Sequence, residues 1–230
     1  MFGNGHRLVM DRALDALDDA DFRQNYDALL LGNLREDVYK FPFLRRFMLG
    51  KGLTHYYRPG RIGGVWFFVP CAPRRTAWLF QRAVRLHRAG RIRDAYFWLG
   101  RAVHLLSEMA APVHSSVVLH WYGDPFELYV EAHARELRKL PLPLLPEAAA
   151  RARTPEELVH LLAVHAQAFP CDRTRNVPGY VAWKLKLLRR PEPAEVVRQV
   201  RALIPMGAAF TLALARLFRA AVQPARAAAA

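Results

Sequence analysis

The stretch Leu99–Ser115, LGRAVHLLSEMAAPVHS, combines a helical apolar pattern with a cluster of potential metal ligands. His104 and Glu108 stand at positions i and i+4, so a helix presents the imidazole and the carboxylate on one face. These side chains at this spacing are typical of zinc ligands. Pro112 is expected to end the helix, which places His114 in the first residues of the following loop. The stretch therefore predicts a helix with a metal site near its C-terminal end.

Helical patterns continue on both sides of this stretch and indicate the fold class. Apolar residues recur at helical spacing along most of the chain, and the sustained alternation that strands require is absent. Thr154 and Pro155 form a strong helix start, with a capping hydroxyl and a proline in the first turn. We therefore expect an all-α, multi-helix bundle. The predicted helices cover residues 7–22, 22–31, 76–89, 92–110, 126–140, 155–169, 180–189, 193–203 and 206–222.

Two segments interrupt the helical pattern. Residues 51–75 mix glycines and prolines with aromatic residues, which predicts a long loop that includes at most one short strand, at Val65–Val69. The aromatic residues of this loop either line the mouth of a cleft or pack against the bundle. The stretch PLPLLP at Pro141–Pro146 predicts a linker. Gly100 has no side chain, which would let another segment or a metal cluster approach the helix closely.

Length and charge limit the class of protein. A chain of 230 residues is expected to form one large domain, residues 1–230. Its 34 Lys and Arg against 20 Asp and Glu leave a formal net charge of +14, so the surface should attract phosphates of lipids or nucleic acids. An alternative interpretation is that an arginine- and alanine-rich chain simply reflects the composition of its genome. Cys71 and Cys171 can form one disulfide or none.

The sequence also leads to expectations about membranes and location. The longest stretches without a charge, residues 109–123 and 202–215, are shorter than the roughly 18 residues that span a bilayer. No transmembrane helix is therefore expected. The N-terminus lacks the apolar segment of a secretory signal, so we expect either a cytoplasmic protein or a matured secreted form.

Several short motifs occur in a fixed order along the chain. They are Gly5-His6, Gly32-x4-Asp37, Thr54-His55-Tyr56, the run Leu99–Ser115 and GDPFELYV at Gly123–Val130. In this order and spacing, the sequence resembles the zinc-dependent phospholipase C family, which shares its fold with the S1/P1-type single-strand nucleases. The resemblance covers about residues 5–135 and implies zinc ions in a cleft among helices. Beyond residue 140, only general helicity supports it, through helices expected from about 154 to 222.

The resemblance implies a ligand set that groups around two or three zinc ions. Asp37 and His55 would hold one zinc with the helical pair. Glu108 stands where the family usually has Asp, and its carboxylate would bridge to a second zinc held with His6. Glu reaches one methylene further than Asp, so bridging is retained while the metal spacing can differ. In chain order, the implied metal ligands are His6, Asp37, His55, His104, Glu108, His114, His120 and Glu127.

The chain departs from the family at two places. A third zinc would use His114 and Glu127, but the family's histidine one turn before that glutamate is replaced by Gly123. His120 or Asp124 would substitute from the nearby loop, and His120 is the better candidate because imidazole suits zinc. Family members that bind zinc through a terminal amine have a mature N-terminal Trp, whereas Met1 and four further residues precede the first histidine here. Two zinc ions are therefore as compatible with the sequence as three.

The activity that the resemblance implies is zinc-dependent hydrolysis of a phosphodiester. Phospholipase C-type cleavage by a metal-bound hydroxide would release diacylglycerol and a phosphorylated headgroup. Asp37 would hold metal and orient the attacking water, and Glu108 would act with it in catalysis. The implied partner is a phospholipid or an anionic membrane surface. Two alternatives stay open: a single-strand nuclease of the S1/P1 type, which the +14 charge favours, and a non-catalytic helical zinc-binding module.

Overall fold

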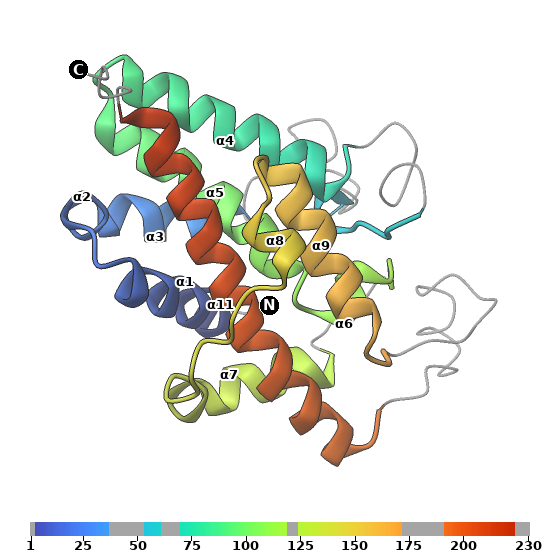
Figure 1. Cartoon of the computed structure of the whole chain (residues 1–230). Helices are drawn as coiled ribbons and strands as arrows, with labels where there is room; N and C mark the ends of the chain where they lie inside the picture. Colours follow the sequence, from blue (N-terminus) through green and yellow to red (C-terminus); the bar gives the residue numbers. More distant parts are fainter. Residues whose placement is uncertain (1–2, 37–52, 61–69, 119–123, 172–190, 224–230) are drawn as a thin grey trace, which may run out of the picture.

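Helices make up the structure, a computed structural model that describes residues 3–36, 53–60, 70–118, 124–171 and 191–223 (Figure 1). The prediction of an all-α fold is confirmed. In chain order, the helices are α1 (Gly3–Leu17), α2 (Ala20–Gln24), α3 (Tyr26–Arg35), the 3-10 helix η3 (Leu53–His55), α4 (Ala72–Arg88), α5 (Ile92–Glu108), α6 (Pro112–Ser115), α7 (Pro125–Leu137), α8 (Glu147–Ala150), α9 (Pro155–Gln167) and α11 (Pro193–Val222).

Side-chain caps begin three of these helices. Asp19 accepts hydrogen bonds from two backbone N–H groups at the start of α2, and Asp124 does the same for α7. Thr154 and Glu157 form a complete capping box on α9, as the sequence around Thr154 predicts. Each cap satisfies N–H groups that have no partner inside the helix, so local sequence determines where these helices begin.

Two predicted helix boundaries differ from the structure near the N-terminus. The first helix ends at Leu17 rather than near residue 22, because Asp18 takes a left-handed backbone conformation with φ of 49°. The predicted helix at 22–31 is divided at Asn25 into α2 and α3, and α3 continues past Gly32 to Arg35. The predicted end at residue 31, directly before Gly32, is therefore wrong. Gly32 instead lies where the helix touches α5, so packing rather than helix termination explains the glycine.

Further differences occur in the C-terminal half and around the predicted loop. The two helices expected at 193–203 and 206–222 are one helix, α11, with Pro205 inside it. Pro205 is buried with its neighbours, so tertiary packing outweighs the cost of the missing N–H. The residues after Pro112 form the short helix α6 instead of a loop, α8 follows the linker, and α4 begins already at Ala72. The strand at 65–69 and the helix at 180–189 lie outside the described residues.

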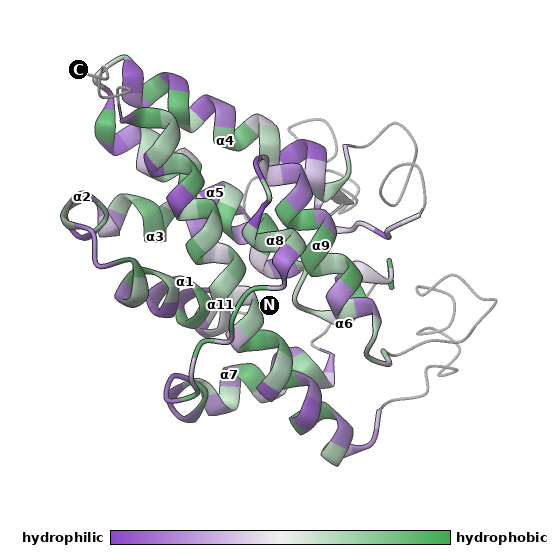
Figure 2. Cartoon of the chain, viewed as in Figure 1, coloured by the Kyte–Doolittle hydropathy of each residue, from purple (hydrophilic) through white to green (hydrophobic). Residues whose placement is uncertain are grey.

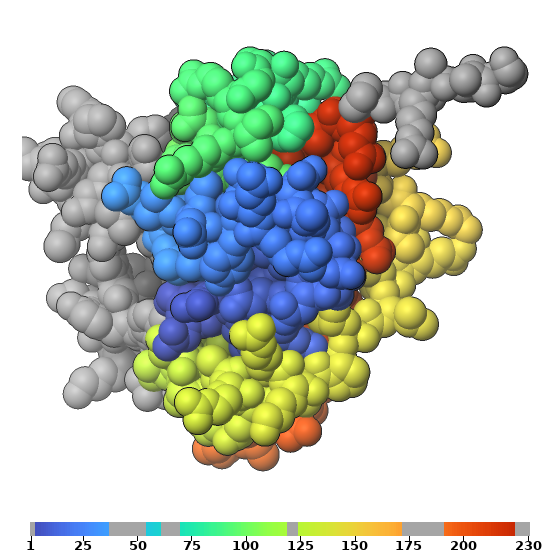
Figure 3. All heavy atoms as spheres, turned by 90° about the vertical axis from the view of Figure 1, so that its left-hand side faces the viewer, coloured from blue at the N-terminus to red at the C-terminus, as the bar shows by residue number. Residues whose placement is uncertain are grey.

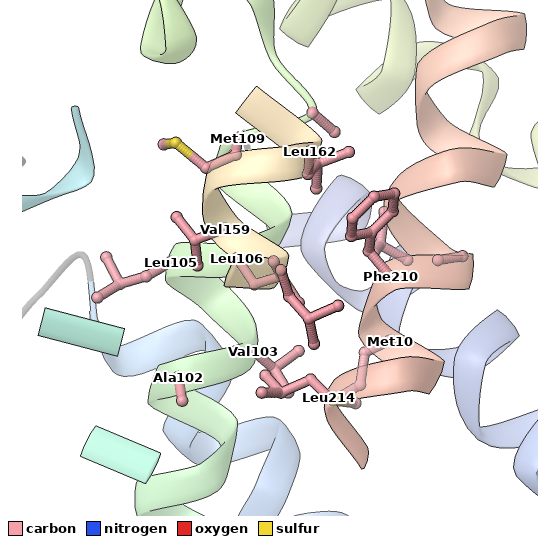
Figure 4. Packing of buried hydrophobic residues seen from close by; sticks show 14 of the residues in the cluster. Met10, Ala102, Val103, Leu105, Leu106, Met109, Val159, Leu162, Phe210 and Leu214 are labelled. Atoms are coloured by element: carbon pink, nitrogen blue, oxygen red, sulfur yellow. The ribbon is translucent and has the colours of Figure 1, made fainter. Parts of the chain in front are cut away.

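The core lies where α5 passes between α3 and α4, and where α11 crosses α1, α7 and α9 (Figure 1). Along α4, hydrophobic and hydrophilic residues alternate (Figure 2), and the buried ones include Leu79 and Phe80. Figure 4 shows Leu106, Val159 and Phe210 meeting in the core from α5, α9 and α11. On one side of the molecule, α4, α3, α1 and α7 follow one another as layers (Figure 3).

Two glycines allow α3 and α5 to touch through their backbones. A Cβ atom built on Gly100 would stand 2.0 Å from the carbonyl oxygen of Leu29, and one built on Gly32 would stand 1.9 Å from that of Phe97. The close approach expected at Gly100 is therefore an approach of helix α3. It places the helix that includes His104 and Glu108 against the N-terminal part of the bundle.

Helix α11 has the length and apolar composition of a membrane-crossing helix. The sequence did not lead us to expect such a helix, since no uncharged stretch is long enough. However, 72% of its most apolar window is buried inside the bundle, the usual position of a core helix. Cys71 and Cys171 are not joined by a disulfide.

Replacing Gly100 with alanine should destabilise the fold. The added methyl group would overlap the Leu29 carbonyl oxygen, and overpacking of this kind costs about 3 kcal/mol. That cost exceeds the gain of roughly 1 kcal/mol in helix propensity. The net cost of about 2 kcal/mol should lower the midpoint of thermal unfolding by about 4–8 °C. Gly3→Ala is the matched control, because its Cβ would meet only Leu34 at 3.8 Å. Equal midpoints for the two variants would contradict the close contact.

Candidate metal centre

Six predicted ligands from five helical elements meet in the interior of the bundle. His6 comes from α1 and His55 from η3, both near one end of their helix. The remaining four are His104 and Glu108 on α5, His114 on α6 and Glu127 on α7. All six residues are buried. The other two predicted ligands, Asp37 and His120, lie outside the described residues.

Glu108 lies at the centre of this group, and its two carboxylate oxygens face different histidines. Oε1 lies 2.7 Å from Nε2 of His6 and 3.7 Å from Nε2 of His104. Oε2 lies 2.6 Å from Nε2 of His114. One carboxylate thus joins two sets of donor atoms, one on each of its sides.

The outer donors complete both sets. On one side, Nε2 of His55 lies 3.0 Å from Nε2 of His104, and the rings of His6 and His104 stack with centroids 3.9 Å apart. On the other side, Nε2 of His114 lies 3.3 Å from Oε1 of Glu127. The two groups that could each hold a metal ion are therefore His6, His104 and Glu108, and Glu108, His114 and Glu127.

These residues fit zinc. Within each group the donor atoms all lie within 4.8 Å of one another, and imidazole nitrogen with carboxylate oxygen is a donor set that zinc prefers. Two ligand atoms about 2.0–2.2 Å from one tetrahedral ion would stand about 3.3–3.6 Å apart, close to several distances found here. Nε2 of His6 lies 2.7 Å from Oε1 of Glu108 without the geometry of a hydrogen bond. A cation would satisfy the Nε2 atom of His6.

The charges of the buried groups are strongly coupled. Burial lowers the pKa of His6 to about 4, and the neighbouring His104 adds to this effect. Burial also opposes charge on His114 and Glu108, but their mutual attraction prevails. The Glu108 carboxylate raises the pKa of His114 to about 9, and the His114 imidazolium keeps the pKa of Glu108 well below its ordinary value. Positive charge next to Glu108 therefore stabilises its ionised form.

Two tyrosines that follow His55 pack against the centre. The Tyr56 ring is buried and stacks on the His114 ring with centroids 4.8 Å apart. The Tyr57 N–H donates to the carbonyl oxygen of His114 at 3.2 Å, and the Tyr57 hydroxyl lies 2.7 Å from Nδ1 of His160 on α9. The sequence left two interpretations of the loop aromatics, and packing against the bundle applies to Tyr56. The ring against which Tyr56 packs is that of the candidate ligand His114.

A buried ion pair next to the centre was not anticipated from the sequence. Arg101, one turn before His104 on α5, is almost fully buried and pairs with Glu36 at the end of α3. The Arg101 guanidinium also stacks over Trp98, 4.4 Å from the ring centroid. Arginine on an apolar helix next to a tryptophan is a weak signal, because only the fold shows that Glu36 lies beside it.

The sequence assigned His114 and Glu127 to a third zinc, and this grouping stays a prediction. In the structure Glu108 lies beside this pair as well, with Oε2 2.6 Å from Nε2 of His114. Asp124, considered from the sequence as a substitute for the missing histidine, caps helix α7 through Oδ1. Ser107 was not singled out, yet its hydroxyl lies 2.9 Å from Nδ1 of His6.

Zinc should stabilise this protein, because ligands from several helices would be joined by the ion. At a zinc concentration of 100 Kd, one ion adds about 2.7 kcal/mol to the free energy of unfolding. We expect chelator-treated protein to gain about 5–10 °C in unfolding midpoint when zinc is restored. Glu108→Gln should lose most of this gain. Glu147→Gln, at an exposed glutamate that pairs only with Arg151, should retain it. A full gain in the Glu108 variant would refute the assignment.

Comparison with known proteins identifies the fold. No protein-family model matches the chain, and no curated protein matches it significantly by sequence. Alpha-toxin of an avian Clostridium perfringens strain superposes with a TM-score of 0.70 and 13% identity, over 95% of this chain and 64% of the toxin. Alpha toxin from Clostridium absonum gives 0.59 and 14%, over 94% of this chain and 66% of the toxin. The chain thus spans about two thirds of the length of these toxins, and over that length it has their all-α fold.

Proposed function

We propose that the chain is a zinc-dependent phosphodiester hydrolase of the phospholipase C type. The observation on which the proposal depends is the position of Glu108, a buried carboxylate shared by two groups of potential zinc ligands. Two further observations support it. The ordered motifs resemble the zinc-dependent phospholipase C family, and the fold is that of the clostridial alpha-toxins.

The ligands that we propose have distinct tasks. When bound, zinc makes water acidic enough to act as a nucleophile near neutral pH and offsets negative charge on the phosphate. Glu108 would hold the two metal positions together, and the histidines would orient their ring nitrogens toward them. Because most of these side chains come from helices packed in the core, they are ordered before substrate arrives. Tyr56 covers one face of His114 and keeps that ring in place.

Phospholipid is the substrate that we propose. The net charge of +14 would favour binding to an anionic lipid surface, and it would offset repulsion between the acidic ligands and a phosphate. Asp37, next to the paired Glu36, would complete the ligand set and orient the attacking water, as the resemblance implies. The metal count, two or three ions, is part of the proposal.

Hydrolysis of phosphatidylcholine tests the proposal directly. Zinc-loaded protein should release phosphocholine and diacylglycerol, and Glu108→Ala should lower kcat/KM by at least about 100-fold. Loss of partners outside the ligand shell already costs about 10–100-fold, and this residue would serve both metal positions. Glu147→Ala is the control and should keep full activity. No release of phosphocholine by protein shown to contain zinc would overturn the lipid substrate.

A single-strand nuclease is the second candidate, and the basic charge is the observation that favours it. Affinity for a polyanion falls steeply with salt, because each neutralised phosphate releases counterions. We expect the rate of hydrolysis of lipid micelles to exceed that of single-stranded DNA at both about 50 mM and about 200 mM salt. Faster DNA hydrolysis that collapses at the higher salt would select the nuclease. Tightly held zinc with hydrolysis of neither substrate would select a non-catalytic zinc module.

A further inference from the structure

We infer that Ser107 is a positioning residue that directs Nε2 of His6 toward a metal ion. The inference deepens the proposed function and rests on the zinc site formed by His6, His104 and Glu108. Ser107 lies on α5 directly before Glu108, it is fully buried, and its hydroxyl is in contact with both histidines of this group.

The Ser107 hydroxyl has one proton and two partners. Its O–H donates to the carbonyl oxygen of His104, with a distance of 2.8 Å between the oxygens. A carbonyl oxygen can only accept, so this bond uses the single hydroxyl proton. Nδ1 of His6 lies 2.9 Å from the same Oγ. Since Oγ has no second proton to give, it accepts a hydrogen bond, and Nδ1 of His6 must be the donor.

The location of that proton determines which nitrogen of His6 can bind metal. A neutral imidazole has one N–H, and the other ring nitrogen offers a lone pair. With the proton on Nδ1, the lone pair is on Nε2, the atom that lies 2.7 Å from Oε1 of Glu108 without hydrogen-bond geometry. Two electron-rich atoms then face the same point, which is the arrangement that a cation requires. A hydrogen bond from the second ring nitrogen is the usual way in which a ligating histidine is oriented.

Two further contacts hold His6 in place. Its ring stacks on the His104 ring with centroids 3.9 Å apart, and the side-chain amide of Asn33 on α3 donates to the backbone carbonyl oxygen of His6 at 3.3 Å, which holds the backbone. Ser107 adds the only contact of the described residues that acts on Nδ1. Stacking limits the tilt of the ring, whereas the hydrogen bond determines which edge of the ring faces Glu108. Ser107 therefore acts on the first group of ligands and not on the group with His114 and Glu127.

The chain offers a matched control for this assignment. Ser115 is also fully buried and lies close in sequence to a predicted ligand. It directly follows His114, whereas Ser107 lies one turn after His104. The Ser115 hydroxyl donates to the Pro112 carbonyl oxygen at 3.1 Å and contacts no imidazole. Ser115→Ala removes the same atoms from a similar environment but leaves every metal ligand untouched.

Zinc competition against a chromophoric chelator is the first test. Ser107→Ala should weaken the binding of one zinc ion by about 10–100-fold, the usual effect of losing a partner of a ligating histidine, and leave the other ion unchanged. Ser115→Ala should bind zinc as the unchanged protein does. Thermal unfolding of the metal-free variants shows whether each is folded. Equal zinc affinities for the two variants, whether both unchanged or both reduced, would overturn the inference.

Long-range proton–nitrogen NMR of the His6 ring in the metal-free protein is the second test. We expect the proton on Nδ1 in the unchanged protein and a mixture of both tautomers in Ser107→Ala. A proton on Nε2 of His6 in the unchanged protein would refute the role of Ser107. This measurement needs neither zinc nor substrate, so it separates the two proposals. Failure to bind zinc would refute the proposed function, while the tautomer would still decide the assignment of Ser107.

Discussion

Burial of the Glu108 carboxylate is the constraint on which the centre of this structure depends. Moving an ionised carboxylate from water into the protein interior costs several kcal/mol unless positive charge and hydrogen bonds compensate for the lost water. Here His6 and His114 lie against its two oxygens, and in the metal-free protein the His114 imidazolium supplies the charge. Since His114 comes from a separate short helix, compensation of this charge requires α5 and α6 to converge, and His6 brings α1 to the other oxygen as a neutral imidazole. The same convergence creates the proposed metal site.

The surrounding bundle is built to hold α5 in place. Gly32 and Gly100 let α3 and α5 touch through their backbones, so the helix with the central ligands has a fixed depth in the core. The buried pair of Arg101 and Glu36 joins the same two helices by charge, close to the ligand end of α5. Removing one member of a buried ion pair leaves the other charge uncompensated, which lowers the free energy of unfolding by more than the intact pair adds to it. Structural and functional constraints therefore meet on one helix.

Contacts outside the ligand set connect the remote parts of the chain to this centre. Tyr56 stacks on His114, and Tyr57 extends the connection to His160 on α9. Helix α9 belongs to the part of the chain for which the motifs predict nothing beyond helicity. Helix α9 nevertheless contacts the surroundings of the centre. It packs against α4, and its His160 lies within hydrogen-bond distance of the Tyr57 hydroxyl. The fold likeness to the alpha-toxins extends over this part as well, since it covers 95% of the chain.

Periodicity and local chemistry were enough to predict the all-α class, the helix start at Thr154 and the candidate ligands on α5. Each depends on neighbours within one or two turns of helix, where sequence spacing is also spatial proximity. The uninterrupted α11, the continuation of α3 past Gly32 and the contact of Glu108 with His114 could not be predicted in this way. They depend on burial energies and charge compensation between segments far apart in the chain. Those terms are decided only when the tertiary structure brings the segments together.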